Sequence, residues 1–384
     1  MQFIDLQTQF RYLEDDIRNA IDSVLKHGRF IMGPEVFELE EQLAERVGVK
    51  HAITCASGTD ALLMVLMAQD IGPGDCVFTS PFSFFATAEV ISLLGATPVF
   101  VDIDPRTFNI DIQKLRLAIE AVKNNDSGIH PLPAFPQSIS SLKPKAVIPV
   151  DIFGLPADYT PLQEIADSEG LFVLEDAAQS FGGSYLGRPT GSLGHAGATS
   201  FFPAKPLGCY GDGGAAFTDD DVLAEKLRSI RNHGEGSGKY DHVRLGLNSR
   251  LDTIQAAVLL QKLKVYSEEQ ERRQKIAEKY TQLLAGYEVQ HIPKGYTSAW
   301  AQFSVIVDDR DKIQSELQKL EIPSMVYYPK GLHRQDVFKF LQYRPNDFGV
   351  TEEVCRHIVS LPMHPYLDDE SVERICSVFP ALNG

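Results

Sequence analysis

Apolar residues recur at helical spacing near the start of the chain and again after a short loop. The spacing predicts one helix over residues 11–25 and a second over Pro34–Val47. Between them, residues 27–34 (HGRFIMGP) contain two glycines and a proline, which indicates a loop. A longer helical pattern with interspersed acidic and basic residues predicts a third helix over Thr253–Leu283.

Short apolar runs alternate with helical stretches from residue 49 to residue 200. Alternation of this kind is typical of βαβ units. We therefore predict an α/β fold whose large domain has a mostly parallel central sheet. The predicted strands are residues 52–55, 76–79, 97–101, 146–149, 171–175 and 198–202.

The alternation of short apolar runs with helical stretches ends near residue 245. We expect a large ligand-binding domain over residues 1–245 and a smaller C-terminal α+β domain over residues 246–384. Residues 121–144 are rich in proline, serine and asparagine, and we interpret them as a surface excursion between a helix and a strand.

Charge and cysteine spacing exclude several classes of function. The 384 residues carry a formal net charge of −16, which repels nucleic acid and acidic membrane surfaces. The first residues are polar and acidic, and no apolar stretch is long enough to cross a bilayer, so we expect a cytoplasmic protein. The five cysteines lie far apart and lack the spacing of zinc ligands, so we expect neither a metal nor a disulfide framework.

Three segments with candidate ligand-binding residues follow predicted strands, at the end where ligands of open α/β sheets bind. The first is CASGTDAL, in which a strand turns into a helix at Ser57. The N–H groups of Gly58 and Thr59 would lie at the helix N-terminus and bind an anion such as a phosphate. An ordinary Ser/Thr/Asp helix cap is the alternative interpretation.

The second and third segments carry a carboxylate and a lysine. In LFVLEDAAQS, a buried strand delivers Asp176 to its tip, where an ionised carboxylate needs a cationic partner such as a protonated ring nitrogen. The alternative is that Asp176 caps a following helix. In SFFPAKPLG, Lys205 lies between two prolines, and a desolvated lysine has a lowered pKa and can form an imine. Together, the phosphate site, carboxylate and lysine match the requirements of pyridoxal 5′-phosphate (PLP).

These residues give the chain its resemblance to the DegT/DnrJ/EryC1/StrS family of sugar aminotransferases, which are fold-type I PLP enzymes. The resemblance runs from about Phe3 to the final predicted helix. It is carried by five motifs in order along the chain: SGTDAL (57–62), EDAAQS (175–180), SFFPAKPLG (200–208), GDGGA (211–215) and LNSRLDTIQAA (247–257).

The resemblance implies a role for each candidate residue. Lys205 would hold PLP as a Schiff base and move a proton, and Asp176 would pair with the pyridinium nitrogen. Phe84 would stack on the ring, with a core phenylalanine as the alternative. The other cofactor-binding residues would be Ser57, Gly58, Thr59 and Ser200 around the phosphate, Gln179 at the phenolic oxygen, and Asn248 reaching the phosphate from the neighbouring subunit of a homodimer with shared active sites.

Within the family, residues 201–203, 205–214 and 360–367 are most similar to aminotransferases that act on UDP-2-acetamido-2-deoxy-3-oxo-glucuronate. The resemblance implies transfer from L-glutamate to a nucleotide-linked keto sugar through pyridoxamine 5′-phosphate, in polysaccharide biosynthesis such as that of lipopolysaccharide O-antigen. Arg250 would bind a uronate carboxylate with two parallel bonds, or would instead form a structural ion pair with Asp252 or another acidic residue. The implied substrate-binding residues are Gly28, Phe30, Ala204, Arg250, Tyr327 and Tyr328.

Three positions depart from the family pattern. Tyr327 stands where a histidine is usual, Ala204 replaces a serine or threonine, and Asp151 replaces a frequent histidine. They leave a 4-keto-sugar aminotransferase and a non-catalytic sugar-nucleotide-binding protein as alternatives. A sugar dehydratase of the same fold has histidine at the lysine position, so Lys205 argues against that activity.

Overall fold

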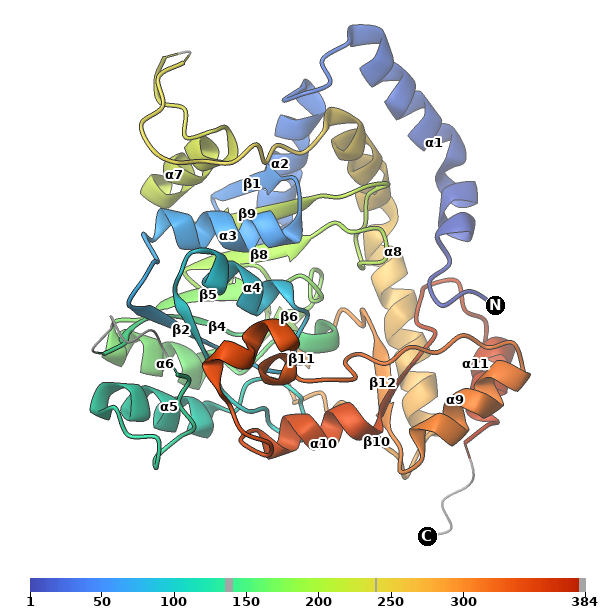
Figure 1. Cartoon of the computed structure of the whole chain (residues 1–384). Coiled ribbons are helices and arrows are strands. Elements are labelled where there is room, and N and C mark those ends of the chain that lie inside the picture. Colours follow the sequence, from blue (N-terminus) through green and yellow to red (C-terminus); the bar gives the residue numbers. More distant parts are fainter. Residues whose placement is uncertain (135–140, 239, 380–384) are drawn as a thin grey trace.

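The computed structural model describes residues 1–134, 141–238 and 240–379 (Figure 1). Its centre is a seven-stranded sheet in the order β1-β9-β8-β5-β4-β2-β3. Strands β3, β2, β4, β5 and β8 run parallel, and β9 lies antiparallel between β8 and β1. The strands are β1 (His51–Cys55), β2 (Asp75–Thr79), β3 (Thr97–Phe100), β4 (Lys143–Ile148), β5 (Phe172–Asp176), β8 (Ala196–Ser200) and β9 (Gly214–Thr218).

The mostly parallel sheet confirms the predicted fold class, and its two faces explain the predicted alternation. Successive residues of a strand point to opposite faces. In β5, Leu174 packs on the side of α3, α4 and α7, whereas Val173 packs on the side of α5 and α6. These helices are α3 (Gly58–Ala68), α4 (Ala86–Leu93), α5 (Ile112–Asn124), α6 (Tyr159–Glu169) and α7 (Asp221–Arg231).

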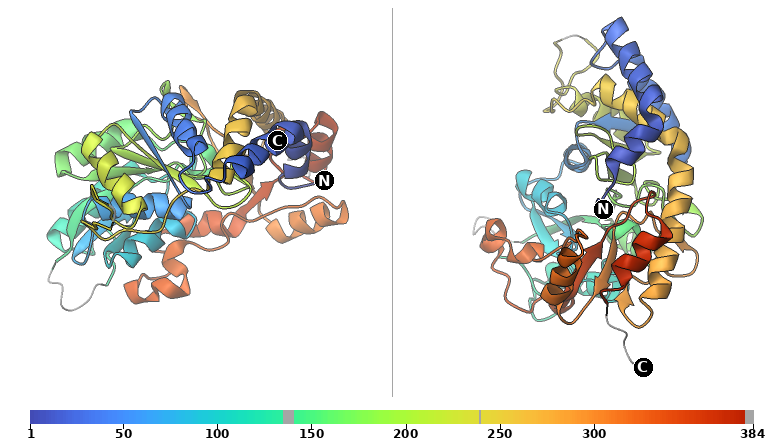
Figure 2. Two further views of the ribbon diagram at one scale, coloured as in Figure 1. Left: turned by 90° about the horizontal axis from the view of Figure 1, so that it is seen from above. Right: turned by 90° about the vertical axis from the view of Figure 1, so that its right-hand side faces the viewer.

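Three helices flank this layered core: α1 (Leu6–His27), α2 (Pro34–Val47) and α8 (Thr253–Leu283). Helices α1 and α8 run side by side, as both views of Figure 2 show. Helices α2 and α8 have the predicted bounds. Helix α1 exceeds its prediction because the Asp5 side chain accepts a hydrogen bond from the Thr8 N–H at one end, and Gly28 terminates the helix with φ of 70° at the other.

The chain beyond α8 forms an α+β unit with its own hydrophobic cluster. Its three-stranded sheet has the order β10-β12-β13. The prediction that the domains divide at residues 245/246 stays a prediction. The remaining elements are β6 (Ser184–Tyr185), β7 (Arg188–Pro189), β10 (Glu288–Val289), β11 (Tyr296–Thr297), β12 (Phe303–Ile306), β13 (Ile358–Leu361), α9 (Arg310–Lys319), α10 (Gly349–His357), α11 (Asp369–Cys376), and the 3₁₀ turns η1 (Ile152–Gly154), η2 (Leu332–Arg334) and η3 (Asp336–Leu341).

The surface excursion expected at residues 121–144 is shorter than predicted. Helix α5 continues to Asn124 because its apolar positions pack on the sheet, and β4 begins at Lys143. Residues 135–140 lie outside the described residues. No helix in the described part of the chain is long and apolar enough to span a membrane.

Candidate active site

A cavity of about 700 Å³ lies at the carboxyl ends of the central strands. It brings together most of the residues that the sequence analysis selected, from strand ends that are far apart in the chain. The selected residues that line it are Ser57, Gly58, Thr59, Phe84, Asp176, Gln179, Ser200, Ala204, Lys205, Tyr327 and Tyr328.

Asp176 is the buried last residue of β5. Its Oδ2 accepts a 2.7 Å hydrogen bond from the Thr87 hydroxyl, and its Oδ1 accepts one of 3.2 Å from the Ala178 N–H. Burial raises the pKa of the Asp176 carboxyl, while these hydrogen bonds and the charge of Lys205 act in the opposite direction. No helix follows directly, so the interpretation of Asp176 as a helix cap is wrong.

Lys205 lies in the turn after β8, where its backbone N–H donates a 2.8 Å hydrogen bond to the carbonyl of Phe202. Burial lowers the pKa of the Lys205 ammonium to about 8, and the charge of Asp176 only partly offsets this. The two groups interact electrostatically, yet they form no direct ion pair in the described structure. A half-buried lysine and a buried carboxylate face one cavity without pairing, which leaves room for a ring between them.

The N-terminus of α3 also lines the cavity. Ser57 caps this helix, because its Oγ accepts a 3.0 Å hydrogen bond from the Asp60 N–H, which confirms the capping interpretation for this residue. The first N–H groups of a helix, here those of Gly58 and Thr59, have no partner inside the helix and can bind an anion. A Cβ on Gly58 would lie 2.6 Å from the Cβ of Ser200, so only glycine allows this close approach to β8.

Phe84 and Gln179 also line the cavity. Phe84 is 58% exposed and lines the cavity, so the interpretation as a core phenylalanine is wrong. The Gln179 Oε1 accepts a 2.7 Å hydrogen bond from the Phe153 N–H, and its Nε2 lies 3.2 Å from the Tyr328 hydroxyl. These bonds fix the amide of Gln179 and leave one N–H of it for another acceptor.

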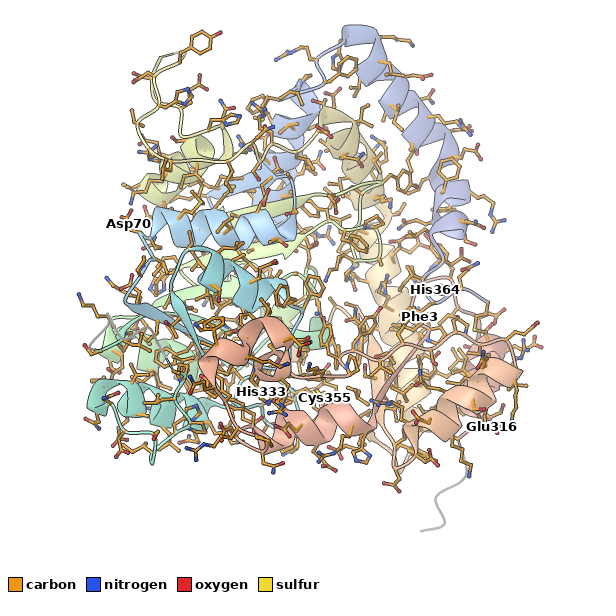
Figure 3. All side chains as sticks on the ribbon, in the orientation of Figure 1. Phe3, Asp70, Glu316, His333, Cys355 and His364 are labelled. Atoms are coloured by element: carbon orange, nitrogen blue, oxygen red, sulfur yellow. The ribbon has the colours of Figure 1, made fainter. Side chains whose placement is uncertain are left out.

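Tyr327, which lies beside Tyr328 in the cavity wall, packs against Phe3 near the start of the chain. The rings of Phe3 and Tyr327 meet edge to face at 6.2 Å. Phe3 lies next to His364 (Figure 3), and its carbonyl accepts a 3.3 Å hydrogen bond from the Met363 N–H. Phe3 therefore packs against a residue of the cavity wall without lining the cavity itself.

Four selected residues do not line the cavity of this chain: Gly28, Phe30, Asn248 and Arg250. Arg250 donates a 2.6 Å hydrogen bond to Oδ1 of Asn232 and a further one to Oδ1 of Asn248. Among the described ion pairs none joins Arg250 to Asp252 or another acidic residue, so that alternative is wrong. The Phe30 carbonyl accepts a 3.0 Å hydrogen bond from the Thr253 N–H, and the Phe30 side chain is 47% exposed.

The sequence analysis missed several polar residues of the site. Thr87 lies one helical turn after Phe84 in SFFAT, and this spacing was the only signal of its contact with Asp176. Gln302 and Lys330 also line the cavity, and no motif marked them. Asp151 lies behind Asp176, where it accepts hydrogen bonds from Ser180 Oγ at 2.8 Å and from the Tyr159 hydroxyl at 3.0 Å.

Comparison with known proteins adds independent findings. The model of the DegT/DnrJ/EryC1/StrS aminotransferase family matches residues 11–379. The UDP-2-acetamido-2-deoxy-3-oxo-D-glucuronate aminotransferase of Pseudomonas aeruginosa is 45% identical over 98% of this chain and 99% of its own. A pleiotropic regulatory protein of Geobacillus stearothermophilus is 42% identical over 98% of each chain.

Solved structures show the same architecture. A DegT DnrJ EryC1 StrS aminotransferase from Brucella abortus superposes with a TM-score of 0.93, at 49% identity over 98% of each chain. The ntda protein from Bacillus subtilis, solved with the bound cofactor PMP, superposes with a TM-score of 0.84 at 29% identity, covering 98% of this chain and 82% of its own.

Proposed function

Because the chain belongs to the DegT/DnrJ/EryC1/StrS aminotransferase family, we propose that it transfers an amino group from L-glutamate to a nucleotide-linked keto sugar. PLP, the cofactor of this family, supplies an aldehyde that holds the amino group and a ring that withdraws electrons. The observation that carries the proposal is the placement of Lys205 and Asp176 at two strand ends, facing one cavity without pairing to each other.

The residues of this chain fit the parts of that cofactor. Asp176, with its hydrogen bonds from Thr87 and Ala178, would hold the protonated ring nitrogen. Lys205, whose pKa burial lowers to about 8, would hold the aldehyde carbon and serve as the base that moves a proton at the reacting carbon. Ser57, Gly58, Thr59 and Ser200 would hold the phosphate, while Gln179 would donate to the ring hydroxyl and Phe84 would cover the ring.

We further propose that the acceptor is the 3-oxo form of UDP-2-acetamido-2-deoxy-glucuronate. The support is the reaction for which the Pseudomonas aeruginosa relative is named. Ala204, Tyr327 and Tyr328 line the cavity in which the sugar would bind. In this proposal the enzyme works in the cytoplasm and supplies a polysaccharide pathway such as that of lipopolysaccharide O-antigen.

Our proposal includes a homodimer with shared active sites. Asn248 and Arg250 are hydrogen-bonded together, and Phe30 is joined to the start of α8, all outside the cavity of their own chain. We propose that Gly28, Phe30, Asn248 and Arg250 enter the cavity of the partner subunit, where Asn248 binds the phosphate and Arg250 the uronate carboxylate.

The test is to add PLP to the purified protein and record the visible spectrum. We expect an absorption band at the blue edge of the visible range, and 2-oxoglutarate after addition of L-glutamate and the keto sugar. Lys205→Ala should lose both, whereas Lys339→Ala on the surface should keep both. An unchanged spectrum in Lys205→Ala would contradict the proposal.

The same assay separates the alternatives. UDP- and dTDP-linked 3-oxo and 4-oxo sugars, tested side by side, identify the carbon that is aminated. A protein that shows the absorption band but forms no 2-oxoglutarate with any of them would be a sugar-nucleotide-binding protein and not an aminotransferase.

A further inference from the structure

Gln302 contributes an unsatisfied acceptor to the cavity. It lines the wall just before β12, and its amide Oε1 is buried without a hydrogen-bond partner among the described residues. Its backbone N–H donates to the carbonyl of Phe153 at 3.4 Å, and the Phe153 N–H in turn donates to Gln179. A buried acceptor without a donor is costly, so this part of the wall is suited to a ligand that brings an O–H or N–H group.

Lys330 contributes a positive charge to the same cavity. It follows Pro329 in the segment that carries Tyr327 and Tyr328, and this segment is fixed by a 2.8 Å hydrogen bond from the Leu332 N–H to the Pro81 carbonyl. Among the described residues that line the cavity, Lys205 and Lys330 are the cations. Because Lys205 has a role at the cofactor, Lys330 is available for an anionic group of a substrate.

The neighbours of Lys330 leave its ammonium group accessible. Its Nζ lies 3.7 Å from Oδ1 of Asp336, but Asp336 also binds Lys339, whose Nζ is closer at 3.1 Å. Asp336 is therefore neutralised without Lys330, whose side chain is 43% exposed. Exposed pairs of this length contribute little energy, so the ammonium can turn toward a carboxylate in the cavity.

We propose that Gln302 and Lys330 bind the sugar of the acceptor and select a sugar acid. In this inference, which rests on the proposed function, Gln302 Oε1 accepts a hydrogen bond from a hydroxyl or N–H group of the sugar. The ammonium of Lys330 pairs with the carboxylate of the same sugar, as a second cation beside the Arg250 that the proposed dimer brings to it from the other subunit.

The chemistry of the two residues favours the sugar acid over the amino donor. Once the amino group of glutamate is engaged at the cofactor, the rest of that molecule carries two carboxylates, which accept hydrogen bonds but donate none. Glutamate would therefore leave Gln302 Oε1 unpaired. A uronate sugar brings hydroxyl donors and an anion together.

Binding of stable sugar nucleotides tests the inference without turnover. We would titrate the cofactor-loaded protein with UDP-glucuronate and with UDP-glucose by calorimetry. Lys330→Met should weaken binding of UDP-glucuronate about tenfold and leave UDP-glucose unchanged, because a lost charged hydrogen bond costs a factor of that order. Gln302→Met should weaken both ligands to a similar degree, because they share the hydroxyl groups.

The controls are matched to each residue. Lys330→Arg should keep the preference for UDP-glucuronate, and Lys319→Met and Gln318→Met should leave both affinities unchanged, since neither residue lines the cavity and Lys319 pairs with Glu316 instead of Asp336. The half-reaction with L-glutamate, followed by the absorption band, should keep its rate in Lys330→Met.

Three outcomes would overturn the inference. Equal loss of both ligands in Lys330→Met would show that the lysine binds the diphosphate. If Lys330→Met lost the half-reaction with glutamate but kept its sugar binding, Lys330 would instead bind the amino donor. If the wild-type protein bound UDP-glucuronate no more tightly than UDP-glucose, the proposed selection of a sugar acid would be wrong. Failure of the proposed function is distinguishable, because it shows as absence of 2-oxoglutarate while the binding preference persists.

Discussion

The Thr87 hydroxyl donates a 2.7 Å hydrogen bond to Oδ2 of Asp176, joining the start of α4 to the end of β5. The Ser83 Oγ lies 2.8 Å from the Thr87 Oγ1. Because the hydrogen of Thr87 is used on Asp176, Ser83 is the donor in this second bond. Burial raises the pKa of the Asp176 carboxyl and the bond from Thr87 opposes that rise, so this chain of hydroxyls helps to keep Asp176 ionised.

Thr87→Val should impair the cofactor site while keeping the shape of the side chain. Without the hydroxyl, the pKa of Asp176 rises further, and a neutral acid binds a protonated ring nitrogen less well. We expect about tenfold weaker PLP binding and an acidic limb of the pH–rate profile that moves to higher pH. Thr87→Ser should retain both properties. A Thr87→Val profile that coincides with the wild-type profile would contradict this role.

Gly58→Ala should damage the phosphate site because the new Cβ would lie 2.6 Å from the Cβ of Ser200. We expect the N-terminus of α3 and the end of β8 to separate, and the affinity for PLP to fall by about tenfold or more. The measurement is a PLP titration followed by the absorption band.

Gly349→Ala is the matched control, since Gly349 also begins a helix and a Cβ there would meet no atom within 4 Å. It should keep the wild-type affinity and leave the stability unchanged or raise it by about 0.5–1 kcal/mol. If Gly58→Ala and Gly349→Ala bound PLP equally well, the close packing of Gly58 against Ser200 would not be needed for the phosphate site.

The sequence predicted the central chemistry because parallel strands present their carboxyl ends along one edge of the sheet. Asp176 and Lys205 could be placed together on that rule alone. Strand β9 was not among the predicted strands, since GDGGAAFT begins like a turn and glycine and alanine are poor strand formers. Its position between β1 and β8 requires small residues, because a Cβ on Gly214 would clash with the carbonyl oxygen of Ser57.

Residues whose role depends on the folded arrangement could not be predicted in the same way. Gln302 and Lys330 belong to the chain beyond α8, and only the packing of that part against the central sheet brings them to the cavity. Arg250 shows the opposite case. A motif selected it as a site residue, but it lies outside the cavity of its own chain, so its role at the site stays a prediction.

Asp151→Asn should change how stability depends on pH. Burial raises the pKa of the Asp151 carboxyl to about 7 and that of its neighbour Glu175 well above its ordinary value. Between about pH 4 and about pH 7, the folded chain therefore keeps protons that the unfolded chain has released. The stabilisation from this protonated pair is present at low pH and is lost as the pH rises through about 7.

The measurement is thermal unfolding of wild type and Asp151→Asn from about pH 5 to about pH 8. We expect the melting temperature of wild type, relative to that of the variant, to fall across this range. Histidines with lowered pKa values, such as His195 and His364, are present in both proteins and cancel in the difference. If the melting temperatures of wild type and Asp151→Asn changed in parallel with pH, the interpretation that the folded chain keeps a proton on Asp151 would be wrong.

Mixed dimers should show whether Arg250 acts across the subunit boundary. Lys205→Ala and Arg250→Ala should each be nearly inactive as pure proteins. In a dimer with shared sites, a mixed dimer has one site that carries both substitutions and one site that is intact. Random 1:1 assembly makes half of the dimers mixed, so we expect recovery of about a quarter of the wild-type activity.

The control for this complementation is a mixture of Lys205→Ala with Asp176→Asn, two residues that line the same cavity. Every site in their mixed dimers carries one of the two substitutions, so activity should stay at the level of the pure variants. If Arg250 served only its own chain, the mixture with Lys205→Ala would behave in the same way as this control. Recovery in the first mixture and none in the second would place Arg250 in the partner's site, because only an exchange of residues between subunits leaves one site intact.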